Sequence, residues 1–498
     1  MPSADAFLAG PRRFTTALLL ATALFGLFHF LRLSPVHGWS DDGSVYLQYA
    51  RNILEGRPYH SVLSGQSLSI TSPPSRYPPV LPLLLTPIVY WRGIDFLACK
   101  ALMLLLFLAS TVVSAYVLRI HFPPSVALAT AFTMLGAHAF WEQADHINSD
   151  FPLLLLCGLL FLAAERWEPR SRFARPLVCA ILIVLATATR TVGATLLPAL
   201  LLYSLWRYRK IPREIWLVCL LSVIPLLALR HLLGGEAYSG QLSNLLNWTT
   251  LRRNLIQYPL ALSEVTGGGF AAAAILNLVL LAGTALSLRR GPQLWAAFAL
   301  SYGCVLVFWP FSDPVRFLIP LWPWITATIF YAIHALQAAA GRGSFAVGAV
   351  ATVFLAFQIP HYRANSATSQ PLGLNNPEML SVYDFTRRSI PPQSVVAFRK
   401  PRTFSLITGI RSIQIGALPP ARLGEDLCRS GATHLLTAPA IFAEDETYLK
   451  PFLDRSRSDL DQLLQTRHFT LYRLSPQACT RFISMPEAPA SSPPPNVR

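Results

Sequence analysis

The chain has 498 residues, of which 53% are hydrophobic and only 13% are charged. Soluble domains usually carry about a quarter charged residues, so this composition excludes an ordinary soluble enzyme and a disordered chain. The net charge of +16 comes mainly from arginines, which lie in short loops between apolar blocks. This distribution is typical of the basic cytoplasmic loops of membrane proteins. It differs from a nucleic-acid-binding stripe, so we expect no nucleic-acid partner.

Apolar blocks follow one another along the first 360 residues. The first block, 14–31, is long for a signal peptide and has no small-residue cleavage site after it, which predicts an uncleaved spanning helix with a cytoplasmic N-terminus. The sequence predicts a polytopic α-helical membrane protein with about eleven transmembrane helices, because each block approaches the roughly 20 residues that cross a bilayer. The further blocks are 96–118, 125–141, 150–165, 176–189, 192–206, 214–232, 269–288, 293–310, 317–337 and 344–360.

The segment 77–91 decides on which side of the membrane the later loops lie. It is apolar but contains four prolines, Pro78, Pro79, Pro82 and Pro87. If it does not cross the membrane, the arginine-rich loops after 165, 206, 288 and 340 are all cytoplasmic, as the positive-inside rule requires. We therefore interpret it as an interfacial or re-entrant segment whose prolines break a straight helix.

This topology predicts three parts. The first is a membrane domain, 1–360, which includes a long outer loop, 34–95, with interfacial helices. The second is a small extracytoplasmic α/β domain, 361–485, where short β-rich runs alternate with helical patterns. The third is a disordered tail, 486–498, rich in Pro, Ser and Ala. We expect the protein in a bacterial inner membrane with its C-terminal domain in the periplasm, where Cys428 and Cys479 could form a disulfide bond.

Two adjacent acids, Asp41 and Asp42, stand near the start of the outer loop. Apolar residues recur at helical spacing after them, which predicts an amphipathic helix on the membrane surface that ends at Gly56. The acids then lie at the N-terminus of this helix. One interpretation is that the acids cap this helix. The other is that one acid removes a proton from an acceptor group, while the second acid orients the first or helps to bind a divalent cation.

The run from Asp41 to Gly56, followed by Arg76-Tyr77-Pro78-Pro79, resembles the GT-C membrane glycosyltransferases. In particular it is similar to the bacterial relatives of the protein O-mannosyltransferases and of the lipid A aminoarabinose transferase. The resemblance implies transfer of a sugar, with inversion, from a polyprenyl-phosphate donor to a lipid, glycan or protein acceptor at the outer face. It also implies that one of the two acids is the general base. The family places a tyrosine four residues after the key acid, and Tyr46 is four residues after Asp42 and five after Asp41, so the choice stays open.

Cations at the outer helix ends are the candidates for binding the donor phosphate. Negative charge grows on the departing phosphate, and cationic donors stabilise it. Ionisable groups at membrane depth are costly and usually functional, although each could instead extend to lipid headgroups or pair with an acid. The candidates are Arg76, Lys100, Arg190 and Arg316.

A second acidic cluster precedes the block 150–165. Asp150, Glu142 and His146 are lower-ranked candidates for contacting the acceptor or a metal ion, because Asp150 with Pro152 is typical of a helix N-terminus. Carboxylates alone do not identify a bound cation. A divalent cation therefore stays an open alternative, and the sequence predicts no other cofactor.

The alternative function is a multi-pass transporter or flippase for a lipid-linked substrate. Such a protein is expected to have repeated halves, broken helices and charges near the middle of the bilayer. Here the charges gather near the predicted helix ends, and the outer loop and outer domain are large. The sequence therefore favours the transferase.

Overall fold

A computed structural model of the chain describes residues 5, 8–35, 41–68, 77–165, 173–232, 247–266, 269–311, 313–340, 345–367, 376–416, 418–442 and 445–484. The chain divides into two compact units. Unit 1 comprises Met1–Pro35 and Arg76–Ser369, and unit 2 comprises Val36–Ser75 and Gln370–Arg498.

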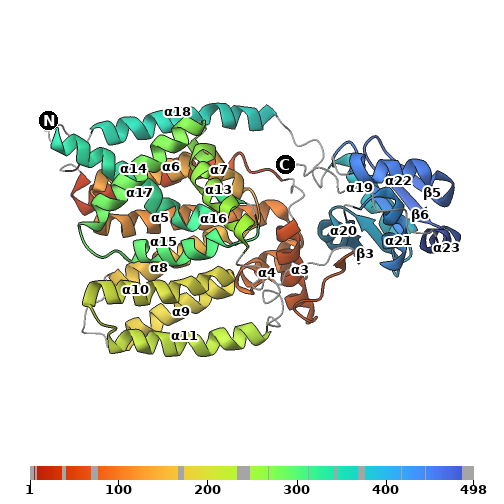
Figure 1. Cartoon of the computed structure of the whole chain (residues 1–498), viewed down its shortest axis with the longest axis horizontal. Helices are drawn as coiled ribbons and strands as arrows, with labels where there is room; N and C mark the ends of the chain where they lie inside the picture. The colour runs from red at the N-terminus through yellow and green to blue at the C-terminus, as the bar shows by residue number, and fades with distance from the viewer. Residues whose placement is uncertain are drawn as a thin grey trace. The chain divides into compact units, whose positions relative to one another are not determined.

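Unit 1 is a bundle of α-helices (Figure 1). Within the described ranges, five segments are long and apolar enough to cross a membrane: Pro11–Phe30, Phe96–His121, Phe270–Leu288, Pro314–Ala339 and Phe345–Ala364. This confirms a helical membrane fold, whereas the number of about eleven crossings stays a prediction. The elements are α2 (Pro11–Phe30), α4 (Val80–Arg92), α5 (Phe96–His121), α6 (Pro124–Gly136), α7 (His138–Ala144), α8 (Asp150–Glu165), α9 (Ala174–Thr189), η1 (Thr191–Thr195), α10 (Leu196–Tyr208), α11 (Arg213–Leu232), α13 (Trp248–Thr266), α14 (Phe270–Leu288), α15 (Leu294–Val307), α16 (Pro314–Leu318), η2 (Ile319–Leu321), α17 (Trp322–Ala339) and α18 (Phe345–Ala367).

Residues 80–92 form a continuous helix, α4, which contains Pro82 and Pro87, so the predicted break at these two prolines is wrong. Pro82 lies in the first turn, where its missing N–H has no intrahelical partner in any case, and Pro87 is tolerated inside the helix. The 13 residues of α4 measure about 20 Å, which is shorter than the roughly 30 Å hydrocarbon core. A helix of this length cannot span the membrane alone.

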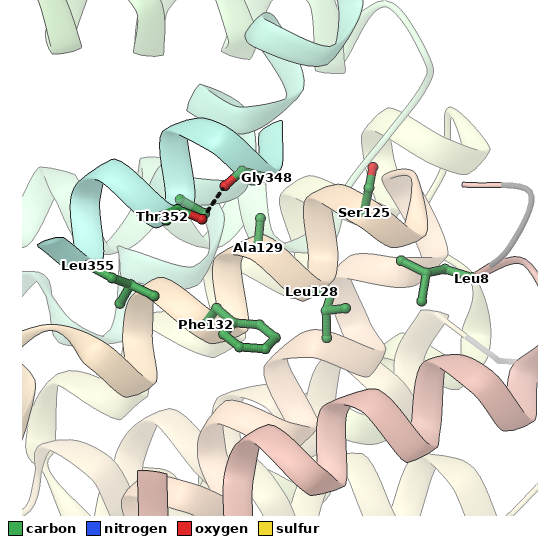
Figure 2. A pocket seen from close by; sticks show the side chains of 9 residues that line it. Leu8, Ser125, Leu128, Ala129, Phe132, Gly348, Thr352 and Leu355 are labelled. Atoms are coloured by element: carbon green, nitrogen blue, oxygen red, sulfur yellow. Dashed lines mark hydrogen bonds between the residues drawn. The ribbon is translucent and has the colours of Figure 1, made fainter. Parts of the chain in front are cut away.

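A cavity of about 300 Å³ lies between α6 and α18 (Figure 2). Its lining is almost wholly apolar. The hydroxyl of Thr352 donates a hydrogen bond of 3.0 Å to the carbonyl of Gly348. Among the residues that the structure describes, its lining includes none of the candidate site residues. Besides Thr352, the described part of the lining includes one further hydroxyl, that of Ser125, and no charged side chain.

Unit 2 is built on a six-stranded sheet with the order β1-β3-β2-β4-β6-β5. β1, β3, β2 and β4 are parallel to one another, whereas β6 and β5 pair antiparallel. The four residues of β2 are all buried, as expected for a central parallel strand. The elements are α3 (Asp41–Glu55), β1 (Ser64–Gln66), α19 (Pro377–Ser389), β2 (Val395–Phe398), α20 (Pro401–Thr408), β3 (Arg411–Gln414), α21 (Pro420–Arg429), β4 (His434–Thr437), η3 (Asp445–Leu449), α22 (Lys450–Arg455), η4 (Arg457–Asp459), β5 (Leu460–Gln465), β6 (Thr470–Leu474) and α23 (Pro476–Ser484).

The first part of the predicted outer loop belongs to unit 2. β1 pairs with β3, with Ser64 opposite Ser412 and Gln66 opposite Gln414, and α3 packs against α20. From the sequence, the whole of 34–95 was expected to go with the membrane domain. The structure divides this loop instead, because β1 completes the edge of the unit 2 sheet.

Helix α3 has the predicted extent, since it runs from Asp41 to Glu55 and Gly56 follows with φ 64°. Protein covers much of its apolar side, whereas its position on the membrane surface stays a prediction. Tyr46 and Tyr49 are buried, and so is the polar Asn52, whose amide donates to the carbonyls of Pro58, Tyr59 and Ser61.

Cys428 of α21 and Cys479 of α23 form a disulfide bond, with their Cα atoms 5.5 Å apart. This confirms the pairing expected from the sequence. The bond closes a loop of 51 residues, and in the chain-entropy model a loop of this size stabilises the folded state by about 4 kcal/mol. Such bonds persist in oxidising compartments.

Candidate functional site

The site residues predicted from the sequence fall into two groups. Unit 1 contains Lys100, Asp150, Arg190 and Arg316, and unit 2 contains the acidic pair at the start of α3. Arg76 lies outside the described residues, and so does the side chain of Asp41.

Asp150 is the centre of the unit 1 group. Its carboxylate is fully buried at the start of α8 and contacts two arginines at once. One oxygen pairs with Nη1 of Arg190, and the other accepts a hydrogen bond of 2.7 Å from Nε of Arg316. Both arginine side chains are 18% exposed. Two positive charges thus share one negative charge, which leaves this triad with a surplus positive charge.

The end of α9 positions Arg190. The helix stops at Thr189, and Arg190 adopts an extended conformation with φ −153° before η1 begins. Its carbonyl accepts a hydrogen bond from the amide of Gly193 at 2.7 Å, which closes the turn. Its guanidinium also lies 5.2 Å from the ring centre of Phe317, the residue after Arg316. This cation–π contact draws the two arginine-bearing segments together.

Gly193 allows η1 to approach α9. A Cβ atom at this position would lie 2.7 Å from the amide nitrogen of Thr187, which is backbone that cannot give way. We expect Gly193→Ala to displace the turn that holds Arg190 and to lower stability by about 1–3 kcal/mol. Thermal unfolding of the purified protein measures this effect. The control is Gly303→Ala in α15, where an added Cβ meets no atom within 4 Å. Equal melting temperatures for the two variants would contradict this account.

Side chains of α15 hold the Arg316 segment. The hydroxyl of Tyr302 donates to the carbonyl of Phe317 at 2.7 Å, and the indole N–H of Trp295 donates to the carbonyl of Pro320 at 3.3 Å. Tyr302 and Trp295 are both buried. Arg316 therefore projects from a segment whose backbone is fixed by buried hydrogen bonds.

Helix α13 was not predicted from the sequence, because it lies between the apolar blocks 214–232 and 269–288. The amide of Asn254, which is buried, donates to the carbonyls of Leu306, Val307 and Trp309 at the end of α15. Arg253 donates to the carbonyl of Pro310 at 2.8 Å. These bonds satisfy carbonyl groups that a helix C-terminus leaves without partners. Because α13 also contacts α16, it supports the segment that carries Arg316.

Lys100 is held by protein groups in unit 1. Its ammonium is almost fully buried and donates to Asp145 at 3.0 Å and to the carbonyl of Ser34 at 2.9 Å. The amide of Ser34 in turn donates to Asp145 at 3.1 Å. Burial raises the pKa of Asp145, and the ammonium of Lys100 opposes this rise. Pairing with an acid was the alternative expected for such a cation, and it applies to Lys100.

The predicted lower-ranked metal or acceptor residues do not gather in one place. Glu142 is exposed, and the ring of His146 bonds to the backbone carbonyl of Glu142 at 2.7 Å. Asp150 is occupied by Arg190 and Arg316. Within the part of the chain that the structure describes, no three His, Cys, Asp or Glu side chains come together in a way that could hold a metal ion.

The unit 2 group includes an arginine that sequence reasoning missed. Nη1 of Arg402, in the first turn of α20, lies 3.8 Å from Oδ1 of Asp42. Both side chains are about a quarter exposed, at 22% and 26%. Beside them, the hydroxyls of Ser44 and Thr403 share a hydrogen bond of 2.7 Å. No local pattern in the sequence connects α3 with the distant α20, so only the fold reveals this pair.

Three solved structures resemble the chain along most of its length. ArnT from Cupriavidus metallidurans bound to undecaprenyl phosphate is 14% identical with a TM-score of 0.56, and its apo state is 14% identical with a TM-score of 0.58. Each alignment covers 93% of this chain and 99% of ArnT. The Archaeoglobus fulgidus oligosaccharyltransferase, in complex with Zn and sulfate, is 12% identical with a TM-score of 0.60, covering 92% of this chain and 73% of that one.

No protein-family model matches the sequence, and neither does any curated protein. At these low identities the likeness concerns the fold. It confirms the GT-C fold that the resemblance in the first outer loop implied.

Proposed function

We propose that the protein is a membrane glycosyltransferase that moves a sugar from a polyprenyl-phosphate carrier to an acceptor at the outer face of the membrane. The observation that carries this proposal is the pair of arginines, Arg190 and Arg316, held side by side by the buried Asp150. A carrier of this kind joins an apolar chain to a phosphate. A protein that binds it needs an apolar helix bundle for the chain and cations at the end of that bundle for the phosphate. The ArnT structure of the same fold contains undecaprenyl phosphate, which supports this choice of ligand.

The proposed step is a single displacement at the anomeric carbon. Asp41 or Asp42 takes a proton from the acceptor group, whose heavy atom forms a bond to the sugar. The bond between the sugar and the phosphate oxygen breaks on the opposite face, so the configuration is inverted. Polyprenyl phosphate leaves with the bonding electron pair, and Arg190 and Arg316 stabilise its growing negative charge.

The remaining candidates have secondary roles in this scheme. Lys100 neutralises Asp145 between α7 and α8, while Arg76 stays a candidate phosphate ligand. A divalent cation bound by the acidic pair of α3 is the alternative way to assist the transfer.

We propose a bacterial inner membrane, with the N-terminus in the cytoplasm and unit 2 in the periplasm. The basic loops between the apolar blocks favour this orientation. The disulfide bond between Cys428 and Cys479 supports an oxidising environment for unit 2. Polyprenyl-phosphate donors that present their sugar on this side would reach the site from the bilayer.

The test uses purified protein reconstituted in lipid vesicles with a panel of polyprenyl-phosphate hexoses and pentoses. A lipid extract and a peptide mixture serve as acceptors, and each reaction is run with and without a chelator. We expect release of polyprenyl phosphate together with a product whose anomeric configuration is inverted, as measured by mass spectrometry and NMR. Movement of the intact donor across the bilayer without any chemical conversion would favour the flippase instead.

A further inference from the structure

Unit 2 anchors the acidic segment at both of its ends. At the start, Ser44 bonds to Thr403 of α20 at 2.7 Å. At the other end, β1 pairs with β3, and the amide of Leu68 donates to the hydroxyl of Ser430 at 2.9 Å. Between these anchors, Asn52 binds three carbonyls of the connection from α3 to β1. The orientation of Asp42 is therefore determined by unit 2.

The connection between β2 and α20 is also fixed, and it sets the position of Arg402. Arg399 follows β2 and donates to the buried Asp445 at 2.8 Å and to the carbonyl of Ile415 at 3.2 Å. Asp445 also accepts from the amide of Ala438, so it joins the ends of β2 and β4. At the first residue of α20, the carbonyl of Pro401 accepts a hydrogen bond of 2.5 Å from Ser412. The backbone that carries Arg402 is thus held on two sides.

We propose that Arg402 is a positioning residue for Asp42, which keeps this carboxylate ionised and oriented for proton transfer. A base must be ionised to accept a proton, and a guanidinium 3.8 Å away favours the charged form of the carboxylate. Both groups are partly exposed, so solvent weakens the effect without removing it. This inference rests on the proposed transferase function and gives unit 2 a direct part in it.

Two further charged residues lie near this pair in the sequence. Asp41 precedes Asp42 on α3, and Lys400 precedes α20. The guanidinium of Arg402, 3.8 Å from Oδ1 of Asp42, stabilises the ionised form of this carboxylate. Loss of Arg402 is therefore expected to raise the pKa of Asp42. Transfer should then fall at low pH and recover at high pH, where Asp42 ionises without help.

The experiment compares Arg402→Gln and Arg402→Lys in the full-length protein, with kcat and KM for sugar transfer measured across pH. We expect Arg402→Gln to move the acidic limb of the kcat profile upward by about one pH unit, whereas Arg402→Lys stays close to the wild type. The matched control is Arg473→Gln, which removes an exposed Arg–Asp pair with Asp461 in the same unit. If the glutamine variant does not fold, Arg402→Met retains the aliphatic stem and serves in its place.

An unchanged pH profile in the folded Arg402→Gln variant would overturn this inference. So would an equal loss of kcat at every pH that Arg402→Lys fails to restore, because that result indicates a purely structural role. Failure of the proposed function looks different. In that case the wild type itself transfers no sugar, or it keeps its activity when the acids of α3 are replaced.

Discussion

Replacing Asp41 and Asp42 together by Asn is expected to abolish sugar transfer while leaving the protein folded. An amide cannot take the proton of the acceptor, and loss of a general base typically lowers turnover by about 10²- to 10⁴-fold. Asp41 and Asp42 are the first two residues of α3, where each charge stabilises a helix by about 0.3–1 kcal/mol, so α3 should survive the loss of both. The measurement is the turnover of purified protein with polyprenyl-phosphate sugar, together with its melting temperature. The two single variants then show which acid is the base, and the contact with Arg402 favours Asp42.

A matched control for the acidic pair is Glu55→Gln at the other end of α3, where the glutamate pairs with Arg51 and Arg57. This change removes one negative charge from the same helix and should leave transfer unchanged. Normal turnover of the double variant would show that neither acid is needed as a base, and the proposed mechanism would then be wrong.

Replacing Asp150 by Asn is expected to destabilise unit 1 and to abolish transfer. The change removes the charge of the carboxylate that the largely buried guanidinium groups of Arg190 and Arg316 share. Removal of one partner from a buried ion pair costs about 3 kcal/mol or more. The arginines should also lose their common orientation, so the phosphate of the donor would lose its binding groups. Thermal unfolding and turnover in the same detergent measure both effects.

The control for this second prediction is Glu142→Gln. Glu142 lies in the helix just before α8, but its side chain is exposed. Exposed charges usually contribute less than 1 kcal/mol, so this variant should behave like the wild type. A variant at Asp150 with normal stability and turnover would show that the arginine pair does not depend on the carboxylate.

Periodicity and length predicted most helices of unit 1, because long apolar blocks leave the chain few alternatives in a bilayer. The block 150–165 corresponds to α8 residue for residue. Helix α13 was missed because it is amphipathic and contains Arg252 and Arg253, so its composition is that of a loop. The sequence predicted an interfacial or re-entrant segment at 77–91 but not an unbroken helix through Pro82 and Pro87, because it does not show at which positions a helix tolerates a proline.

The candidate site could be predicted only in part, because individual charges are visible in a sequence but their partners are not. Arg190 and Arg316 were identified from their positions at predicted helix ends, and the structure brings both to Asp150. The central role of Asp150 was underestimated, because a carboxylate in a first helical turn is also typical of a cap. Strand β1 has only three residues, one of them glycine, so its pairing with β3 left no detectable signal.

The pairing of Ser64 with Ser412 also has a consequence for biosynthesis. A ribosome delivers the acidic helix first and its neighbouring strand β3 only after all of unit 1 has been translated. Contacts so distant along the chain form late in folding. The acids therefore acquire their final environment only in a completely synthesised polypeptide. In the proposed mechanism, a prematurely terminated chain would have the phosphate-binding arginines but no ordered base, so it could not transfer the sugar.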